Sequence, residues 1–153
     1  MHTSIGVEVA ASPQRFFELA GDVPHWHEML PHYRQVTVRS RDGDRIVATM
    51  AARRPGRLAV PVSWRAEHWP DLTDPDDLRL HFRHVGGATR GMNVVWHIRP
   101  TPTGSSVTIE HEFSRRLPLL GPNFFPRLVD RLFVRPIAGR TLATFKALAE
   151  AGG

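Results

Sequence analysis

Histidine is the side chain best suited to move protons near neutral pH, and the sequence concentrates three of its nine histidines in one short segment. Residues 22–33, DVPHWHEMLPHY, contain His25, His27 and His32 beside a glutamate, a tryptophan and a tyrosine. A pair of helical histidines can share a metal ion when they lie four residues apart, and no pair here has that spacing. We therefore expect no metal site in this segment.

Three further histidines continue the apolar phase of alternating, strand-like segments, in which residues two apart point to the same face. They are His68, His84 and His111. An imidazole in an apolar wall needs a hydrogen-bonding partner, which can be solvent or a backbone group at a strand end, or a bound ligand. Three imidazoles and a water can hold catalytic zinc, but positions on separate strands are not a metal-binding motif, so no metal is expected.

The elements that position these side chains begin with a strand and two short helices. Residues 4–10 alternate apolar and polar side chains, as a half-buried strand does. Ser12 is a good N-cap, Pro13 suits the first helical position, and Gly21 marks the end of that helix. Residues 23–31 are bounded by prolines and have room for about two helical turns.

From Tyr33 the period of the pattern changes to two, and six strand-like segments follow with turn formers between them. Their ranges are 33–40, 45–52, 58–69, 76–85, 91–98 and 105–114. Asp42 and Gly43 form a hairpin signal between the first two. Consecutive strands with short links predict an antiparallel meander.

Residues 122–151 return to helical spacing and predict a long final helix. Pro136 and Gly139 interrupt the pattern, and we expect a kink or break there because an interior proline removes a backbone hydrogen bond. The candidates for the buried stripe are Phe124, Leu128, Leu132, Leu142, Phe145 and Leu148.

Length and composition restrict the class of protein. A chain of 153 residues can bury one core, so we expect a single domain over residues 1–153. It contains no cysteine, and neither a signal peptide nor a membrane span is predicted, so a cytoplasmic location is expected. The net charge of +5 comes almost wholly from arginine. Aromatic residues are not interleaved with the arginine clusters, which argues against nucleic-acid binding.

The order of these segments resembles a known family along nearly the whole chain. HWHEMLPHY, RDGD, VSWRAEHW, GMNVVW and EHEF occur in the order and with spacing similar to those of the START-like helix-grip (SRPBCC) superfamily, in particular its polyketide cyclase and aromatase/cyclase branch. The resemblance implies an α+β fold of the START/Bet v 1 type. In it, a curved antiparallel sheet of about seven strands surrounds a long C-terminal helix, with two short helices after the first strand.

The resemblance also implies an activity and a set of positions. Aromatase/cyclases fold a carrier-bound poly-β-ketone into an aromatic ring by aldol condensation and dehydration in a cavity. The resemblance puts His68 where these enzymes use a functional arginine, and histidine, unlike arginine, can also transfer protons. The positions that correspond to cavity residues of the family are Trp26, Tyr33, Trp64, Met92 and Trp96.

We therefore expect a cofactor-independent polyketide cyclase or dehydrase in which His68 moves protons and Tyr33 hydrogen-bonds a substrate oxygen. The expected partners are a hydrophobic small molecule or lipid and, as a candidate, an acyl carrier protein; either a monomer or a homodimer is compatible with the sequence. The expected substrate-binding residues are Trp26, Met50, Trp64, Phe82, His84, Met92, Trp96, Ile109, His111, Leu128 and Leu132.

A second function stays open, namely a non-catalytic carrier of a lipid or an isoprenoid quinone. The segment 115–133, RRLPLLGPNFFPRLVDRLF, resembles the wider cyclase/dehydrase and quinone-binding relatives more than the aromatase/cyclases. In a carrier, His68 is only a satisfied wall residue.

Overall fold

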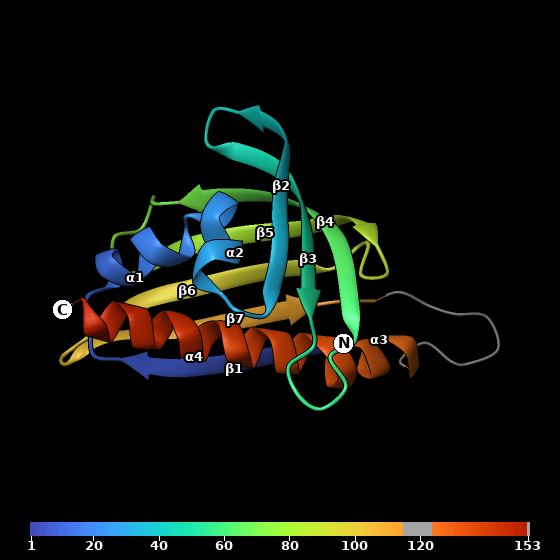
Figure 1. The fold of residues 1–153 in the computed structure, drawn as a ribbon. Helices are drawn as coiled ribbons and strands as arrows, with labels where there is room; N and C mark the ends of the chain where they lie inside the picture. The colour runs from blue at the N-terminus through green and yellow to red at the C-terminus, as the bar shows by residue number, and fades with distance from the viewer. Residues whose placement is uncertain (115–123, 153) are drawn as a thin grey trace.

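The described part of the chain, residues 1–114 and 124–152 of a computed structural model, forms an antiparallel seven-stranded sheet that curves around a long C-terminal helix (Figure 1). The strand order is β1-β7-β6-β5-β4-β3-β2, so the meander predicted from residue 33 onward is confirmed and β1 joins it beside β7. The strands are β1 His2–Val9, β2 Tyr33–Asp42, β3 Arg45–Arg53, β4 Pro61–Asp71, β5 Leu78–Gly87, β6 Asn93–Thr101 and β7 Gly104–Glu112.

Two short helical segments follow β1, as the sequence predicts. The Ser12 hydroxyl accepts a hydrogen bond from the backbone N–H of Arg15 (3.2 Å) and caps α1, Pro13–Ala20. A 3₁₀ turn, η1 (Val23–His25), leads directly into the single turn of α2, Trp26–Met29. This arrangement carries Trp26 to the interior, where its indole N–H donates to the carbonyl of Ala20 (2.9 Å).

The C-terminal helical region has three parts, α3 (Phe124–Val129), a π-helical turn η2 (Asp130–Val134) and α4 (Arg135–Ala151). The irregularity expected near Pro136 lies just before it. Pro136 lies in the first turn of α4, directly after η2, and the clash of its ring with the carbonyl four residues earlier falls within η2. Gly139 does not break the helix.

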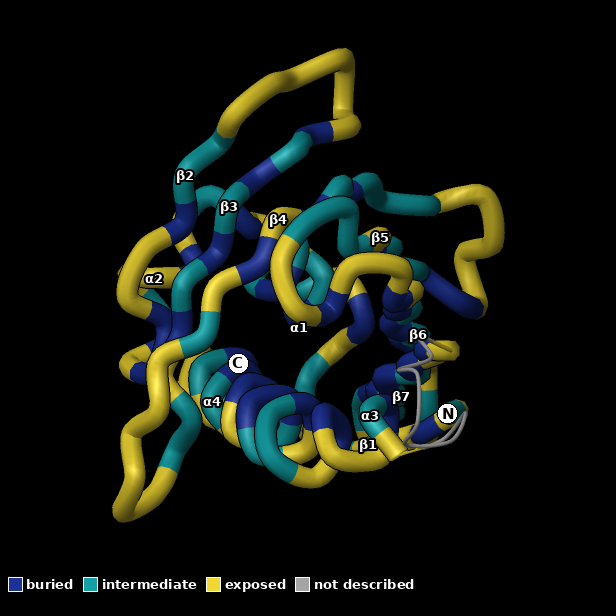
Figure 2. The backbone as a smooth tube through the Cα atoms, turned by 90° about the vertical axis from the view of Figure 1, so that its right-hand side faces the viewer, coloured by how far each residue is buried: buried dark blue, intermediate teal, exposed yellow. Residues whose placement is uncertain are grey.

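Register shifts in β2 bend the hairpin that it forms with β3. The pairing slips between Tyr33 and Gln35 and again between Val38 and Ser40, and such bulges increase strand twist. The turn at Asp42 and Gly43 is confirmed, with Gly43 in the left-handed region (φ 61°). The tip of this hairpin projects beyond the rest of the sheet and is exposed (Figures 1 and 2).

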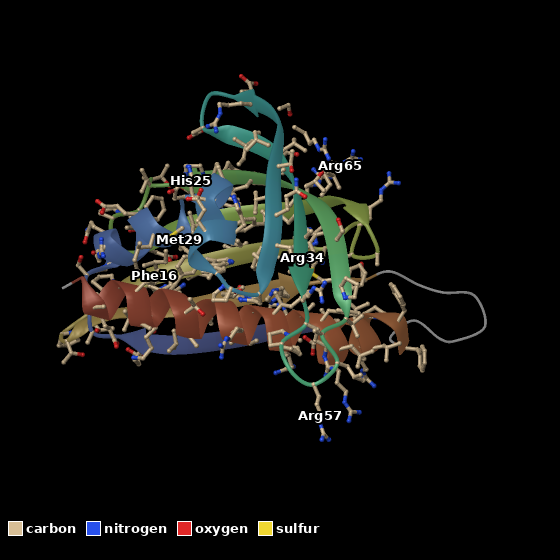
Figure 3. The ribbon with its side chains drawn as sticks, in the orientation of Figure 1. Phe16, His25, Met29, Arg34, Arg57 and Arg65 are labelled. Carbon is tan, nitrogen blue, oxygen red and sulfur yellow. The ribbon has the colours of Figure 1, made fainter. Side chains whose placement is uncertain are left out.

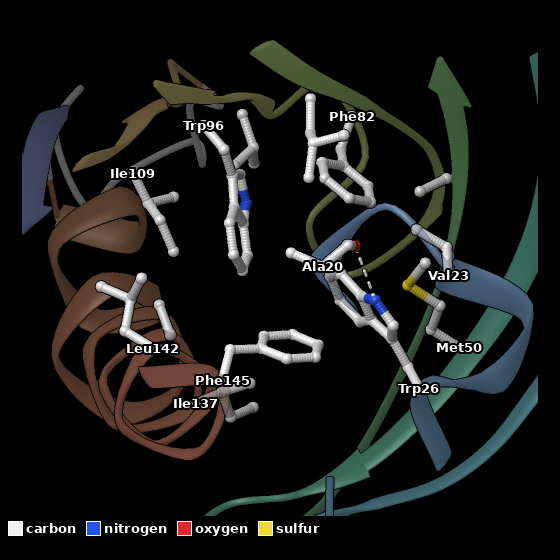
Figure 4. Packing of buried hydrophobic residues seen from close by; sticks show 14 of the residues in the cluster. Ala20, Val23, Trp26, Met50, Phe82, Trp96, Ile109, Ile137, Leu142 and Phe145 are labelled. Carbon is white, nitrogen blue, oxygen red and sulfur yellow. Dashed lines mark hydrogen bonds between the residues drawn. The ribbon is translucent and has the colours of Figure 1, made fainter. Parts of the chain in front are cut away.

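The core lies between the concave face of the sheet and α4, and aromatic rings fill much of it (Figure 4). The Trp26 ring lies 5.5 Å from that of Phe82, 5.7 Å from that of Trp96 and 5.7 Å from that of Phe145, measured between centroids. Phe16 of α1 also packs against Trp96 and Phe145, with ring centroids 6.4 Å and 6.1 Å apart. These contacts couple the short helices, the sheet and α4 in one cluster.

Candidate functional site

A cavity of about 80 Å³ lies between the concave face of the sheet and the helical region formed by η2 and α4. The sheet supplies most of its aromatic side chains, while η2 and α4 supply Phe133, several aliphatic side chains and the hydroxyl of Thr141. The lining consists of Trp26, Tyr33, Met50, Val62, Trp64, Phe82, His84, Thr89, Met92, Val94, Trp96, Ile109, His111, Phe133, Val134, Ile137, Ala138 and Thr141.

Most side chains that the sequence assigns to ligand binding meet in this lining. Tyr33 is among them. The nine others are Trp26, Met50, Trp64, Phe82, His84, Met92, Trp96, Ile109 and His111. Three assigned residues lie elsewhere, and they are His68, Leu128 and Leu132.

His68 is buried on the concave side of β4, where it contacts neighbouring residues and does not line the cavity. Its Nδ1 lies 2.9 Å from the backbone carbonyl of His81, and its ring stacks on Phe82 at 4.4 Å. Phe82 itself lines the cavity. His68 therefore has a backbone partner, as in the interpretation of a satisfied wall residue.

Leu128 and Leu132, which the sequence assigns to substrate binding, do not line this cavity. Leu128 is 41% exposed, and Leu132 is half-buried and outside the lining. A π-helical turn contains more residues than an α-helical turn, so η2 changes which residues within it and N-terminal to it face inward. Val129 and Val134 are buried instead.

One polar part of the lining is formed by Tyr33 of β2 and Thr141 of α4. The Nε2 atom of His32, which is buried behind them, lies 2.8 Å from the Thr141 hydroxyl. That hydroxyl also lies 2.7 Å from the backbone carbonyl of Ile137 and faces the hydroxyl of Tyr33. Burial raises the pKa of Tyr33, and the phenol is neutral at physiological pH.

Trp64 separates this polar part from a second one, formed by His84, Thr89 and His111. The Trp64 ring lies 5.9 Å from that of Tyr33 and is stacked on that of His84 at 5.8 Å. The Nδ1 atom of His84 lies 2.6 Å from the Thr89 hydroxyl in the β5–β6 connection. His111 enters the cavity from β7.

Burial keeps both imidazoles of the second part neutral. Burial and, to a smaller extent, the proximity of His111 lower the pKa of His84 to about 3. The pKa of His111 is lowered to about 4 by burial, although Asp130 opposes the shift by favouring the charged imidazole. A neutral imidazole offers one N–H donor and one lone pair, so each ring can both donate and accept a proton.

Asp130 is a buried carboxylate of η2 that acts electrostatically on His111. Its Oδ2 accepts a hydrogen bond from Arg135 Nε (2.8 Å), whereas its Oδ1 and the Nδ1 of His111 are both buried without a partner. Two unpaired buried polar atoms in one region cost free energy unless a water or ligand group joins them. Short π-helical turns often occur at functional sites. This one contains Asp130 and contributes Phe133 and Val134 to the lining of the cavity.

The histidines of the first segment separate as their spacing predicts. His25 lies on the surface with its Nδ1 2.7 Å from Asp22, and hydrogen bonding to this carboxylate raises its pKa. His27 is exposed, and only His32 enters the interior. Across the described residues, no three His, Cys, Asp or Glu side chains are grouped to hold a metal ion.

A second hollow, of about 430 Å³, lies outside the core between β1 and α4. Ile5, Val7 and Leu142 give it an apolar floor. Its two charged side chains, Lys146 and Glu150, are paired with each other at 2.6 Å. It therefore lacks the unpaired buried polar atoms found near the first cavity.

The sequence interpretation missed Thr141, Thr89, His32 and Asp130. Thr141 lies four residues before Phe145 on the same face of α4, so helical spacing from that residue identifies it. The other three lie in a connection, in a loop and in a π-helical turn, where neither the period of a strand nor that of an α-helix applies.

Comparison with known proteins gives consistent matches. A model of the family described as polyketide cyclase / dehydrase and lipid transport matches residues 2–150. A curated protein of Streptomyces cyaneus, named provisionally as a polyketide cyclase, is 24% identical over 116 residues, which cover 75% of this chain and 74% of that protein.

Two solved structures illustrate the similarity of fold. The Zhui aromatase/cyclase of a Streptomyces species superimposes with a TM-score of 0.80 at 17% identity, over 100% of this chain and 98% of that one. A START superfamily protein of Mycobacterium smegmatis gives 0.73 at 13% identity, over 99% of each chain. The predicted helix-grip fold is thereby confirmed. No helix in the described ranges is long and apolar enough to cross a membrane.

Proposed function

Because the chain belongs to the polyketide cyclase / dehydrase and lipid transport family, we propose that it cyclises and dehydrates a poly-β-ketone in the cavity between the sheet and α4. The observation that carries the proposal is the pair of neutral imidazoles, His84 and His111, in an otherwise largely apolar lining. Such a lining excludes water from reactive intermediates, while the imidazoles supply proton transfer.

His111 is the proposed general base. It takes a proton from a methylene between two ketones and becomes an imidazolium. The resulting enolate carbon bonds to another ketone carbon of the chain, and the new alkoxide takes the proton back from the imidazolium to become a hydroxyl. Loss of that hydroxyl with a neighbouring hydrogen as water gives the unsaturated ring. Asp130 favours the protonated form of His111, and thereby stabilises the imidazolium formed in the first step.

The sequence alone favours His68 for this role, but its position outside the lining supports His111 instead. Tyr33 lies on the opposite side of Trp64 from His84 and is proposed to hydrogen-bond a ring oxygen. The aromatic residues between them provide flat surfaces against which the chain can fold.

The cavity must widen to admit such a substrate. Its volume of about 80 Å³ is below the roughly 300–1,000 Å³ of common ligand pockets. Met50 and Met92 contribute side chains that adapt readily to irregular shapes. Ligand binding is therefore expected to displace lining side chains.

A carrier protein is the proposed source of the substrate. Acyl carrier proteins have acidic surfaces, and the connection between β3 and β4 is basic, with Arg54 and Arg57 beside the exposed Leu58. Arg57 projects away from the body of the molecule (Figure 3). Charge complementarity at this connection supports a docking role.

The alternative is a carrier that binds a lipid or quinone without reaction. It is favoured by the largely apolar lining and by lipid transport in the description of the family. In this case His84 and His111 serve only to hydrogen-bond the ligand or bound water.

Product analysis after incubation with a carrier-bound poly-β-ketone distinguishes the two functions. We expect wild type to form cyclised, dehydrated products, and His111→Gln to lose about 10²- to 10⁴-fold in rate, as removal of a general base does. His68→Gln and the convex-face variant His97→Gln are matched controls expected to retain most activity, with thermal unfolding to verify their fold. Wild-type products identical to the spontaneous ones, together with a co-purified lipid in native mass spectrometry, favour the carrier.

A further inference from the structure

Arg54 follows β3 and lies on the cavity side of the sheet. Residues two apart on a strand share a face, and Met50 and Ala52 of β3 are buried on the concave face. Arg54 continues their phase. Its backbone N–H donates to the carbonyl of Val60 (2.9 Å), so the pairing of the two chain segments extends beyond β3 and β4. Because Met50 lines the cavity, Arg54 lies at the edge of the cavity.

The guanidinium of Arg54 lacks the partners that a half-buried cation usually has. Its Nε is buried and has no hydrogen-bond partner among the described residues. The arginines that form ion pairs within residues 1–114 and 124–152 are Arg45, Arg79, Arg99 and Arg135. A buried N–H without an acceptor costs free energy, which a water or a ligand oxygen can recover. Arg54 is therefore suited to bind a group that the described chain does not supply.

A second guanidinium approaches this edge from α4. The carbonyl of His32 accepts a hydrogen bond from the backbone N–H of Arg53 (2.8 Å), and its Nε2 lies 2.8 Å from the hydroxyl of Thr141. His32 therefore connects the residue before Arg54 to the residue after Arg140. Burial and, to a smaller extent, the positive charge of Arg140 lower the pKa of His32 to about 4, which agrees with this proximity.

Arg54 and Arg140 thus place two positive charges on either side of a neutral histidine. Arg140 is exposed and, like Arg54, belongs to none of the ion pairs between described residues. Like charges repel each other, and an anion between them replaces this repulsion by attraction. Guanidinium groups bind phosphate and carboxylate oxygens through paired N–H groups. A phosphate has more oxygens than a carboxylate and can therefore bind both arginines.

We propose that Arg54 and Arg140 bind a phosphate ester at the edge of the cavity, while the apolar part of the same ligand occupies the lining. The inference rests on the cavity being the ligand site, as proposed above, but requires no reaction there. In a cyclase, the phosphate belongs to the phosphopantetheine arm on which a carrier protein holds its substrate. In a lipid carrier, it belongs to a phospholipid headgroup. Arg57 projects away from the body of the molecule and is not part of this site (Figure 3).

Isothermal titration calorimetry with a matched pair of thioethers tests the proposal. Both carry the same naphthylmethyl group, one on pantetheine and the other on 4′-phosphopantetheine, so that they differ only in the phosphate. Wild type is expected to bind the phosphorylated thioether about tenfold more tightly, the effect of a charge-assisted hydrogen bond. Added salt should weaken this preference by screening the charges. The neutral probe 2-naphthol has no arm and reports the cavity alone.

Arg54→Gln is the decisive variant because it removes the charge and keeps a polar side chain. It is expected to abolish the tenfold preference and to leave the affinities for 2-naphthol and for the pantetheine thioether unchanged. Arg54→Lys keeps the charge without the planar group and should retain part of the preference. Arg140→Gln, at an exposed position that is unlikely to affect folding, should also reduce it. Arg83→Gln, on the exposed convex side of β5, is the matched control and should have no effect.

Vesicle binding distinguishes the two sources of the phosphate. Sedimentation with phosphatidylglycerol vesicles is compared between wild type and Arg54→Gln. Vesicle binding that depends on Arg54 supports the site as one for a lipid headgroup. A preference for the phosphorylated thioether that depends on Arg54, without vesicle binding, supports it as a site for the arm of a carrier protein.

The outcomes separate this inference from the proposed function. Equal affinities of wild type for the two thioethers overturn the phosphate site and leave the cavity as a ligand site. The same preference in wild type, Arg54→Gln and Arg140→Gln also overturns it. Failure of 2-naphthol and both thioethers to bind wild type overturns the cavity as a site for ring-shaped ligands, and with it both proposals.

Discussion

Histidines on the two faces of the same sheet have opposite kinds of partners. On the concave face, His68 bonds to a backbone carbonyl and His84 to a threonine hydroxyl, and both have lowered pKa values. On the convex face, His97 lies 3.0 Å from the carboxylate of Asp77 and 3.7 Å from that of Glu110.

The same contrast recurs on β4 and β5. The convex His81 lies 3.6 Å from Asp71 and is stacked on the ring of Trp69. Trp69 directly follows the buried His68 in the chain, yet the two side chains point to opposite faces of β4. Strand alternation alone separates these environments. The partners of a histidine therefore distinguish one suited to proton transfer in an apolar cavity from one that belongs to a charged network on the convex face.

The largest expected difference between the two faces is in the stability lost when a histidine is replaced by a permanently charged arginine. His84→Arg places a guanidinium beside Trp64 without a carboxylate partner, and we expect a loss of about 3–5 kcal/mol in the free energy of unfolding. His97→Arg keeps Asp77 and Glu110 as partners for its charge and should cost less, about 1–2 kcal/mol. Urea denaturation at pH 7 measures both, and equal losses would contradict the comparison.

Acid should destabilise the protein through the concave histidines. Above pH 6.5 they are neutral in both states and add no pH dependence; as the pH falls, the unfolded chain binds protons that the folded imidazoles, with pKa values of about 3 to 4, do not. Stability is therefore expected to fall between pH 6.5 and 4. Unfolding of His111→Gln should take up about one proton fewer than unfolding of wild type over this range, so its stability should depend less steeply on pH.

Urea denaturation of wild type and His111→Gln at pH 7, 6, 5 and 4.5 gives this difference directly. His25→Gln is the exposed control, since Asp22 shifts the pKa of His25 in the opposite direction. An identical pH dependence in wild type and His111→Gln would show that His111 is not buried in the neutral form.

The smallest expected effect concerns the convex face. Arg45 lies over the Trp69 ring, 4.1 Å from its centroid, and pairs with Glu67. These contacts are partly exposed, so Arg45→Ala should cost about 1 kcal/mol or less in stability and leave probe affinity unchanged. A change in 2-naphthol affinity in this variant would mean that the two faces are coupled.

The sequence predicts the fold and much of the lining because strands report their faces through a period of two. Trp64, Trp96 and Ile109 follow from that period, which needs no knowledge of neighbouring strands. The environment of His68 does not follow from the period, because alternation indicates the face of the sheet but not whether a position on that face borders the cavity. For His68 this depends on the Phe82 ring and the His81 carbonyl that lie next to it.

The helical side of the cavity was harder to predict for a different reason. Extrapolating an α-helical stripe from Phe145 toward Leu128 assumes a constant number of residues per turn, and η2 breaks that assumption. Asp130 then faces the interior, although a carboxylate is among the residues least expected there.

Histidine side-chain ¹⁵N–¹H spectra at pH 6, recorded while 2-naphthol is added, test most directly that ligands bind on the concave face beside neutral imidazoles. The account predicts neutral imidazoles at His84 and His111, with signals that shift on titration while those of His81 and His97 stay in place. Protonated signals at His84 and His111, or shifts confined to His81 and His97, would contradict it.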